Sequence, residues 1–239
     1  MKSFSPLLRA AALALTLITL LLALPSCGNT VLYETTEGDL TFTLYGTGSG
    51  DKSKVERIVV TRDGKKVGTY DQVGLRRELA GDDYGFSTVD LNFDGILDMR
   101  LKTAKKTAGM QFACYLWDAE KGYYVYHPSL SALQNLTVAD TISAITACEY
   151  EYTVDPATGD TPEFYTERNA FVIYRWIDGK LNEVHRKELT YYEESDIYCY
   201  AVFDLDEDGE MDTTRESWIT ADRFDADRYP LDATGYAAG

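Results

Sequence analysis

Two short segments of the chain carry acidic residues at a spacing that suits a hard cation. Each reads D-x-[DN]-x-D-G-x-x-D, first at 90–98 and again at 204–212. Ca²⁺ takes roughly six to eight oxygen ligands, and side chains at positions 1, 3 and 5 converge when a glycine at position 6 allows a sharp turn. The expected ligands are Asp90, Asn92, Asp94, the carbonyl of Ile96 and Asp98 in the first loop, and Asp204, Asp206, Asp208, the carbonyl of Glu210 and Asp212 in the second. The pattern therefore predicts Ca²⁺ as a cofactor.

Neither segment is an EF-hand. Position 12 holds Leu101 in the first segment and Arg215 in the second, where an EF-hand has a bidentate glutamate. Strand-like stretches at 86–89 and 200–203 precede the segments, so these would be loops between β-strands. Clusters of Asp, Asn and Gly also form turns without a ligand, and this alternative stays open. Like charges this close repel one another unless a cation neutralises them, which favours a metal, and Mg²⁺ fits a cage of protein oxygens less well than Ca²⁺.

Residues around the first loop resemble a known family. The tetrapeptide Asn-Phe-Asp-Gly at 92–95 is followed by Tyr-Leu-Trp-Asp at 115–118 and by Leu-Ser-Ala-Leu at 130–133. In this order they resemble a family of bacterial envelope lipoproteins with an N-F-D-G calcium loop, and the loops resemble the Asp-rich loops of FG-GAP/VCBS and dockerin-like repeats. The resemblance extends over about residues 86–186. It implies a small β-propeller-like fold, and some relatives are periplasmic immunity proteins that inhibit lysozyme-like toxins.

The first 26 residues are typical of a bacterial lipoprotein signal peptide. Lys2 and Arg9 form a positive start, an apolar stretch follows at 10–23, and Leu-Pro-Ser-Cys at 24–27 resembles a lipobox. We expect cleavage before Cys27, lipidation of its thiol, a short linker at 27–30 and a β-rich domain at 31–239. Two acyl chains anchor stably, so this predicts a protein held on the extracytoplasmic face of a bacterial cell membrane. A plain signal peptide and an uncleaved anchor are the alternatives.

The charge balance limits the partners. The formal net charge is −16, and it becomes −18 when Lys2 and Arg9 are removed with the signal peptide. Nucleic acids and anionic lipid surfaces need a basic footprint, so the composition argues against both. Contact with a membrane is expected only through the lipid anchor, and the expected partner is a protein or glycan ligand in the cell envelope.

Strand formers and turn signals predict an all-β fold. The chain contains 18 Tyr, and apolar residues alternate with polar ones at 40–45. Asp63-Gly64 and Asp178-Gly179 separate strand-like segments, and Asp-Gly supplies the positive φ angles of a type I′ hairpin turn. We expect consecutive antiparallel hairpins in a small β-propeller-like or sandwich architecture, with one or two helical turns at 129–136.

Three cysteines remain besides Cys27, namely Cys114, Cys148 and Cys199. An odd number allows at most one internal disulfide bond. Each of the three lies in an apolar or aromatic stretch, so we expect buried free thiols.

Catalytic motifs are absent from the sequence. The two histidines, His127 and His185, stand beside no nucleophile motif, zinc motif or P-loop. The chain is therefore expected to be a calcium-binding envelope lipoprotein and a binding module rather than an enzyme, with inhibition of a lysozyme-like cell-wall enzyme as its candidate role. An envelope hydrolase acting on glycans and a purely structural surface lipoprotein are the alternatives.

Overall fold

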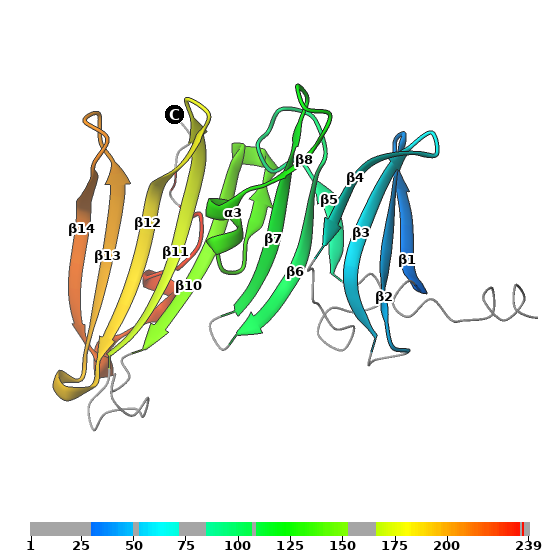
Figure 1. Ribbon diagram of the computed structural model, residues 1–239. Helices are drawn as coiled ribbons and strands as arrows, with labels where there is room; N and C mark the ends of the chain where they lie inside the picture. Colours follow the sequence, from blue (N-terminus) through cyan, green and yellow to red (C-terminus); the bar gives the residue numbers. More distant parts are fainter. Residues whose placement is uncertain are drawn as a thin grey trace, which may run out of the picture.

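The computed structural model describes residues 30–49, 53–71, 85–106, 109–152, 166–234 and 236. The expected signal peptide at 1–26 and the lipidation site Cys27 lie outside these residues. Figure 1 shows strands standing side by side in antiparallel sheets that follow one another along the chain. Within the described part of the chain, no helix is long and apolar enough to span a membrane. The expected all-β fold of consecutive hairpins is confirmed.

The first two sheets are meanders in which each strand pairs with the next. The first sheet contains β1 (Thr30–Glu37), β2 (Leu40–Thr47), β3 (Lys54–Arg62) and β4 (Lys65–Asp71). The second sheet contains β5 (Phe86–Val89), β6 (Asp98–Lys106), β7 (Gly109–Asp118) and β8 (Tyr123–Tyr126).

The third sheet has six strands in the order β14-β13-β12-β11-β10-β9. Its strands are β9 (Thr137–Ala139), β10 (Ala144–Tyr152), β11 (Thr166–Ile177), β12 (Lys180–Tyr192), β13 (Ile197–Leu205) and β14 (Met211–Thr220). Short 3-10 turns are η2 (Asp140–Ile142), η3 (Glu193–Ser195), η4 (Ala221–Arg223) and η5 (Ala226–Arg228).

The expected helical turn is α3 (Pro128–Ala132), which lies between β8 and β9. His127 caps it, because its Nδ1 accepts a hydrogen bond from the backbone N–H of Leu130 at 3.2 Å. Pro128 is the first residue of the helix, where a backbone N–H would have no partner within the helix, so proline loses no hydrogen bond there. Burial lowers the pKa of His127, which keeps Nδ1 available as an acceptor. His127 therefore has a structural role at the end of this helix.

The Asp-Gly pairs form the hairpin turns that their sequence predicts. Asp63 and Gly64 have φ angles of 50° and 72°, and they join β3 to β4. Asp178 and Gly179 also have φ angles of 50° and 72°, and they join β11 to β12. Two successive residues in the left-handed region define a type I′ turn, whose twist matches that of the flanking strands.

The sheets pack face to face and bury their cores between them. Phe42 of β2 lies against Phe86 and Tyr124 of the second sheet, with ring centroids 5.1 and 5.9 Å away. The core between the second and third sheets contains Leu91, Phe112, Cys114, Leu130, Leu136 and Ile145. The far face of the third sheet packs against the C-terminal segment through Ala144, Phe171, Ile173, Leu231 and Tyr236. The architecture is sandwich-like, with no closed barrel among the described residues.

The three described cysteines are free, but only Cys114 is buried as predicted. The side chain of Cys148 is exposed, although its backbone N–H and carbonyl bond to Gln134 and Asn135. Cys199 is partly exposed, opposite the exposed Trp218 of β14. Apolar sequence neighbours alone therefore did not ensure burial at the last two positions.

We expect Phe42→Ala to lower the free energy of unfolding by about 3–5 kcal/mol, because it removes a fully buried ring and leaves a cavity between two sheets. Val31→Ala, at an exposed position of β1, should change it by less than about 0.5 kcal/mol. Urea denaturation of the full-length protein measures both values. Equal losses in the two variants would contradict this assignment of the core.

Candidate functional site

The first Asp-rich loop connects β5 to β6 and wraps around Asp90. The Asp90 carboxylate accepts hydrogen bonds from the backbone N–H groups of Asp94, at 3.2 Å, and Gly95, at 2.8 Å. Gly95 has a φ of 84°, the left-handed turn expected at position 6. The Asn92 side-chain amide donates to the Asp94 carboxylate at 2.9 Å. The structure thus brings Asp90, Asn92 and Asp94 of the predicted ligand set together.

Asp98 lies beneath this loop and is fully buried. Its Oδ2 accepts a hydrogen bond from the N–H of Leu91, and its Oδ1 accepts one from the N–H of Trp117, both at 2.8 Å. Burial raises the pKa of Asp98 to about 7, and the charges of Asp94 and Asp90 act in the same direction, whereas the two N–H donors oppose the shift. One buried carboxylate therefore joins the loop, the start of β6 and the end of β7.

The loop is also held by its own sheet and by the third sheet. The indole Nε1–H of Trp176, in β11 of the third sheet, donates to the carbonyl of Leu91 at 2.9 Å. The hydroxyl of Tyr124 donates to the carbonyl of Leu97 at 3.1 Å. Ile96 and Leu97 themselves are exposed at the tip of the loop. Backbone groups on both sides of the acidic cluster are thus fixed by partners far away in sequence.

The second Asp-rich loop forms a hairpin turn between β13 and β14. The backbone N–H of Asp206 donates to the carbonyl of Glu210 at 2.8 Å, so the ladder continues to the turn itself. The Asp206 carboxylate accepts from the N–H groups of Asp208 and Glu210, both at 2.9 Å. Asp208, Glu210 and Asp212 are exposed.

Asp204 bonds outside the second loop. Its Oδ1 lies 2.6 Å from His185 Nδ1 in β12, and its Oδ2 accepts a hydrogen bond from the Thr214 hydroxyl at 2.8 Å. Burial acts to raise the pKa of Asp204, but the hydrogen bonds from His185 and Thr214 outweigh it and hold the pKa below its usual value. Both carboxylate oxygens of this predicted ligand are therefore engaged by the face of the sheet.

Among the residues that the structure describes, no group of three or more His, Cys, Asp or Glu side chains is arranged as a metal site. The calcium assignment thus stays a prediction for both loops. The two loops differ in their surroundings, because the first is held by a buried carboxylate, its own sheet and the third sheet, whereas the second is a turn at the end of two strands.

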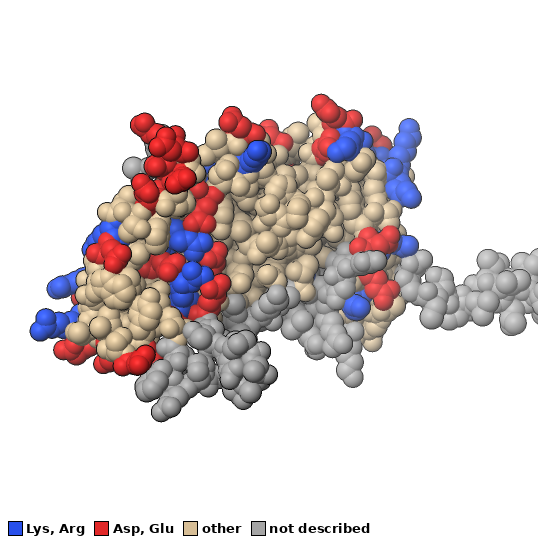
Figure 2. Space-filling view, turned by 60° about the vertical axis from the view of Figure 1, so that its left-hand side comes forward, with Lys and Arg blue, Asp and Glu red and all other residues tan. Residues whose placement is uncertain are grey.

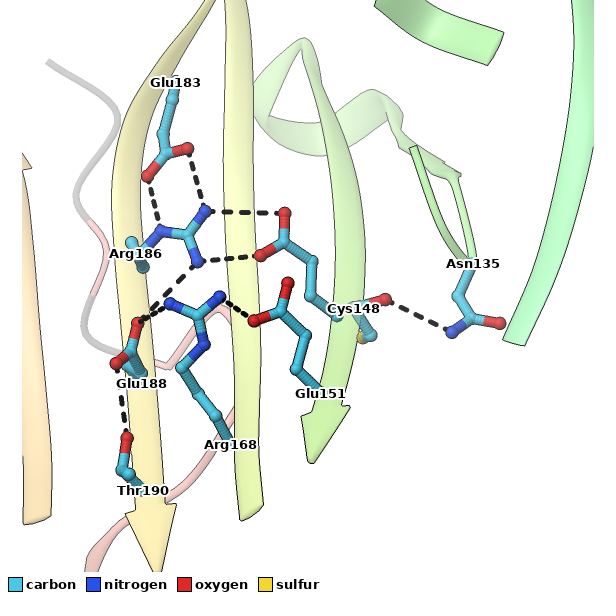
Figure 3. A network of polar contacts seen from close by, with 9 residues as sticks. Asn135, Cys148, Glu151, Arg168, Glu183, Arg186, Glu188 and Thr190 are labelled. Atoms are coloured by element: carbon cyan, nitrogen blue, oxygen red, sulfur yellow. Dashed lines mark hydrogen bonds and ion pairs between the residues drawn. The ribbon is translucent and has the colours of Figure 1, made fainter. Parts of the chain in front are cut away.

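A charge network covers part of the third sheet on the face of β10, β11 and β12 that Figure 3 shows. Arg186 donates to Glu183 at 2.7 Å and to Glu149 at 2.8 Å, while Arg168 bonds to Glu151 and Glu188. Burial acts to lower the pKa of Arg186, but hydrogen bonds with Glu183 and Glu149 reverse this and raise it. These paired ions join three adjacent strands and stabilise the sheet.

Sequence reasoning missed a pocket on the opposite face of the third sheet. This sheet-face pocket has a volume of about 700 Å³, and its walls come from β12, β13, β14 and the C-terminal segment at 227–236. His185 and Lys187 of β12 line it, although the sequence analysis gave neither a role. The pocket residues come from four separate segments, so no sequence motif identifies them. The sequence does show polar residues at both even and odd positions within 183–188, which means that a strand there must place polar side chains on both faces of its sheet.

No protein-family model and no curated protein matches the chain. Among solved structures, one described as "Structure of a Xanthomonas Type IV Secretion System related protein" is similar, at 15% sequence identity and a TM-score of 0.49. The match covers 79% of this chain and 98% of that chain. This degree of likeness establishes no function, and the functional assignment rests on the residues of the chain itself.

The raised pKa of Asp98 predicts a pH dependence of stability in the metal-free protein. The folded state keeps a proton on Asp98 up to a pKa of about 7, whereas the unfolded chain releases it near 3.8. The contribution is therefore fully present below about pH 4 and is lost as the pH rises through 7. With chelator present, we expect the free energy of unfolding to fall more steeply between pH 4 and 7 in the parent than in Asp98→Asn. Urea denaturation across this range tests it, and parallel curves would count against it.

Proposed function

We propose that this protein is a calcium-stabilised binding module of the bacterial envelope, without catalytic activity, held at a membrane by a lipid on Cys27. The observation that carries the calcium assignment is Asp98, a fully buried carboxylate beneath a loop that already gathers Asp90 and Asp94. Three acidic groups around one loop repel one another, and a divalent cation that binds only the folded state offsets that repulsion.

The first loop fits calcium better than the second. Asp90, Asn92, Asp94, the carbonyl of Ile96 and Asp98 would hold the ion, and all are oxygen donors of the kind that Ca²⁺ prefers. Trp176 of the third sheet holds Leu91 and Tyr124 of the loop's own sheet holds Leu97, so the loop backbone is ordered before metal binds. In the second loop, Asp204 is hydrogen-bonded through both oxygens, as Asp98 is, but Asp208, Glu210 and Asp212 are exposed and the described residues place no partner from another sheet on the turn. The proposal therefore places calcium in the first loop alone.

Removal of calcium should lower the melting temperature. At a hundredfold excess over Kd, a ligand stabilises the folded state by about 2.7 kcal/mol, which is about 5–10 °C for a domain of this size. We expect millimolar Ca²⁺ to restore the loss better than Mg²⁺. Asp94→Ala should abolish most of this response, and the matched variant Asp208→Ala in the second loop should retain it. Melting curves of the full-length parent and of both variants, each recorded with chelator, with Ca²⁺ and with Mg²⁺, measure these responses.

Two outcomes would contradict this assignment. Identical melting curves with chelator and with Ca²⁺, together with no heat of binding by calorimetry, would exclude a metal at the first loop. A response lost in Asp208→Ala and kept in Asp94→Ala would move the site to the second loop.

The anchor rests on the lipobox-like sequence Leu-Pro-Ser-Cys at 24–27. We expect Cys27→Ser to block lipidation and to move the protein from the detergent phase to the aqueous phase in Triton X-114 partition, because the acyl chains supply the membrane affinity. Cys148→Ser, at an exposed free thiol, is the matched control and should partition like the parent. Unchanged partition of Cys27→Ser would refute a lipid at this position.

One edge of the molecule carries the connections at 63–64, 90–97, 119–122, 178–179 and 206–210, and it offers a surface for a basic protein. We call it the turn edge, and it runs along the top of Figure 1. Figure 2 shows groups of Asp and Glu along the same edge, with Lys and Arg between some of them. Exposed apolar side chains lie in these connections and beside them, namely Ile96, Leu97, Tyr123, Tyr126 and Ile177. An acidic rim around apolar groups complements a basic partner, and we propose a lysozyme-like cell-wall enzyme as that partner.

If the turn edge binds such an enzyme, charge reversal there should slow association. We expect Glu120→Lys, in the turn between β7 and β8, to reduce the association rate by about threefold or more at low salt, and less at high salt. Glu194→Lys, exposed in η3 outside the turn edge, is the control with the same charge change and should have a smaller effect. Muramidase kinetics that are unchanged by a micromolar excess of the full-length protein, across several lysozyme types, would remove this partner.

A further inference from the structure

The sheet-face pocket holds a chain of hydrogen bonds that ends in an unused nitrogen. His185 is only 4% exposed, and its Nδ1 faces the carboxylate of Asp204 at 2.6 Å. A carboxylate only accepts, so Nδ1 carries a proton, and in the neutral imidazole Nε2 is then an acceptor. Nε2 is shielded from water and has no hydrogen-bond partner among the described residues. A buried polar atom without a partner costs about 1–3 kcal/mol, so this nitrogen calls for a donor.

Aromatic rings enclose the pocket at both ends. The ring of Tyr236, from the C-terminal segment, lies against the imidazole of His185 with centroids 5.2 Å apart. At the other end, the buried ring of Tyr200 lies 5.3 Å from Tyr229. Lys187 holds the C-terminal segment over the sheet, because its Nζ donates to the carbonyl of Thr234 at 2.5 Å. The sheet therefore forms the floor of the pocket, the segment held at Thr234 forms its roof, and the Tyr236 ring covers His185.

Arg215 places a cation at the end of the pocket that Tyr200 forms. Its guanidinium lies 5.5 Å from the Tyr200 ring and 5.9 Å from the Tyr229 ring. Within the described part of the chain, it forms no ion pair. Lys187 and Arg228 also line the pocket, but each lies beside a carboxylate, Asp232 at 3.7 Å and Asp225 at 3.2 Å. Arg215 is therefore the cation of the lining that is open to an anionic ligand.

The strand register gives the distance that a ligand must span. Arg215 of β14 is opposite Val202 of β13, which is opposite Lys187 of β12. His185 is on the same strand as Lys187, two strands away from Arg215, and lies two residues before Lys187. At about 4.8 Å between strands and about 7 Å per two residues, their backbones are roughly 12 Å apart. The guanidinium of Arg215 lies over Tyr200, on the side of Val202 away from Asp204 and His185, so a ligand that reaches both ends must be extended.

We propose that the sheet-face pocket binds a small carboxylate that also carries an N–H or O–H donor. The carboxylate lies on the guanidinium of Arg215, which matches it with two parallel N–H donors. The donor reaches Nε2 of His185 by displacing the Tyr236 ring. Tyr200 and Tyr229 flank the carboxylate end. The end of a short peptide and a sugar acid both have this chemistry, and a volume of about 700 Å³ accommodates either.

The test is calorimetry on the full-length protein in detergent, with N-acetyl-alanyl-alanine and glucuronate as the probes. We expect at least one of the two to bind with a Kd in the millimolar range or tighter, and the one that binds identifies the source as peptide or sugar. The peptide amide and glucose, which lack the carboxylate, should bind at least about tenfold more weakly. The peptide that is methylated at both amide nitrogens lacks the N–H donor, and its affinity should be lower by a similar factor.

Protein variants separate this pocket from weak binding elsewhere. Arg215→Gln should weaken binding of the active probe by about tenfold or more, and Arg223→Gln, an exposed arginine outside the pocket, should leave it unchanged. Melting curves identify any variant that fails to fold, and in that case the carboxylate-free probes decide alone. No binding by either acid at 10 mM (about the weakest Kd of interest), equal binding of the amide or glucose, or equal binding by folded Arg215→Gln and Arg223→Gln would overturn the proposal.

Discussion

A four-stranded antiparallel meander cannot bury its apolar face by itself, and the whole molecule follows from the need to cover each sheet with another. The second sheet shows this most clearly because it is covered on both faces. Along β7, Phe112 and Cys114 pack toward the third sheet, whereas Tyr115 and Trp117 pack toward the first. The period-2 alternation of a strand thus serves two cores at once. The first and third sheets depend on this middle layer for their buried surface.

Stacked sheets meet only through side chains, so backbone groups at the joints need partners from outside their own ladder. Asp98 serves this purpose between the first loop and β7, and Trp176 does so between the third sheet and Leu91. Asn135 connects the second and third sheets, since its side chain accepts from the N–H of Met110 and donates to the carbonyl of Cys148. The contacts of Trp176 and Asn135 fix how the second and third sheets lie on each other, whereas Asp98 fixes the first loop within the second sheet. The first acidic loop sits where two of them meet.

Two loops with the same acidic pattern have acquired different surroundings. The first lies between sheets, and its last carboxylate is buried under the stack. The second lies at the tip of β13 and β14, where β14 is an edge strand and no further layer covers the turn. Its first carboxylate is drawn to His185 on the neighbouring strand and becomes part of the pocket wall. Identical spacing along the chain therefore leads to a cation-suited loop in one case and to a turn with an adjoining pocket in the other.

Short-range features of this chain were readable from the amino acids alone. Asp63-Gly64 and Asp178-Gly179 form their turns because positive φ angles are a local property of those residues. Alternation likewise predicted strands, and the glycine at position 6 of the first loop predicted the sharp turn that Gly95 forms. Burial and hydrogen-bond partners were a different matter. Whether Asp98 is buried, Asp204 bonds to His185 or Cys148 faces solvent depends on residues up to dozens of positions away, brought together by strand pairing and sheet stacking. Local preferences carry no information about such partners, so packing alone set the environment in which each carboxylate and imidazole acts.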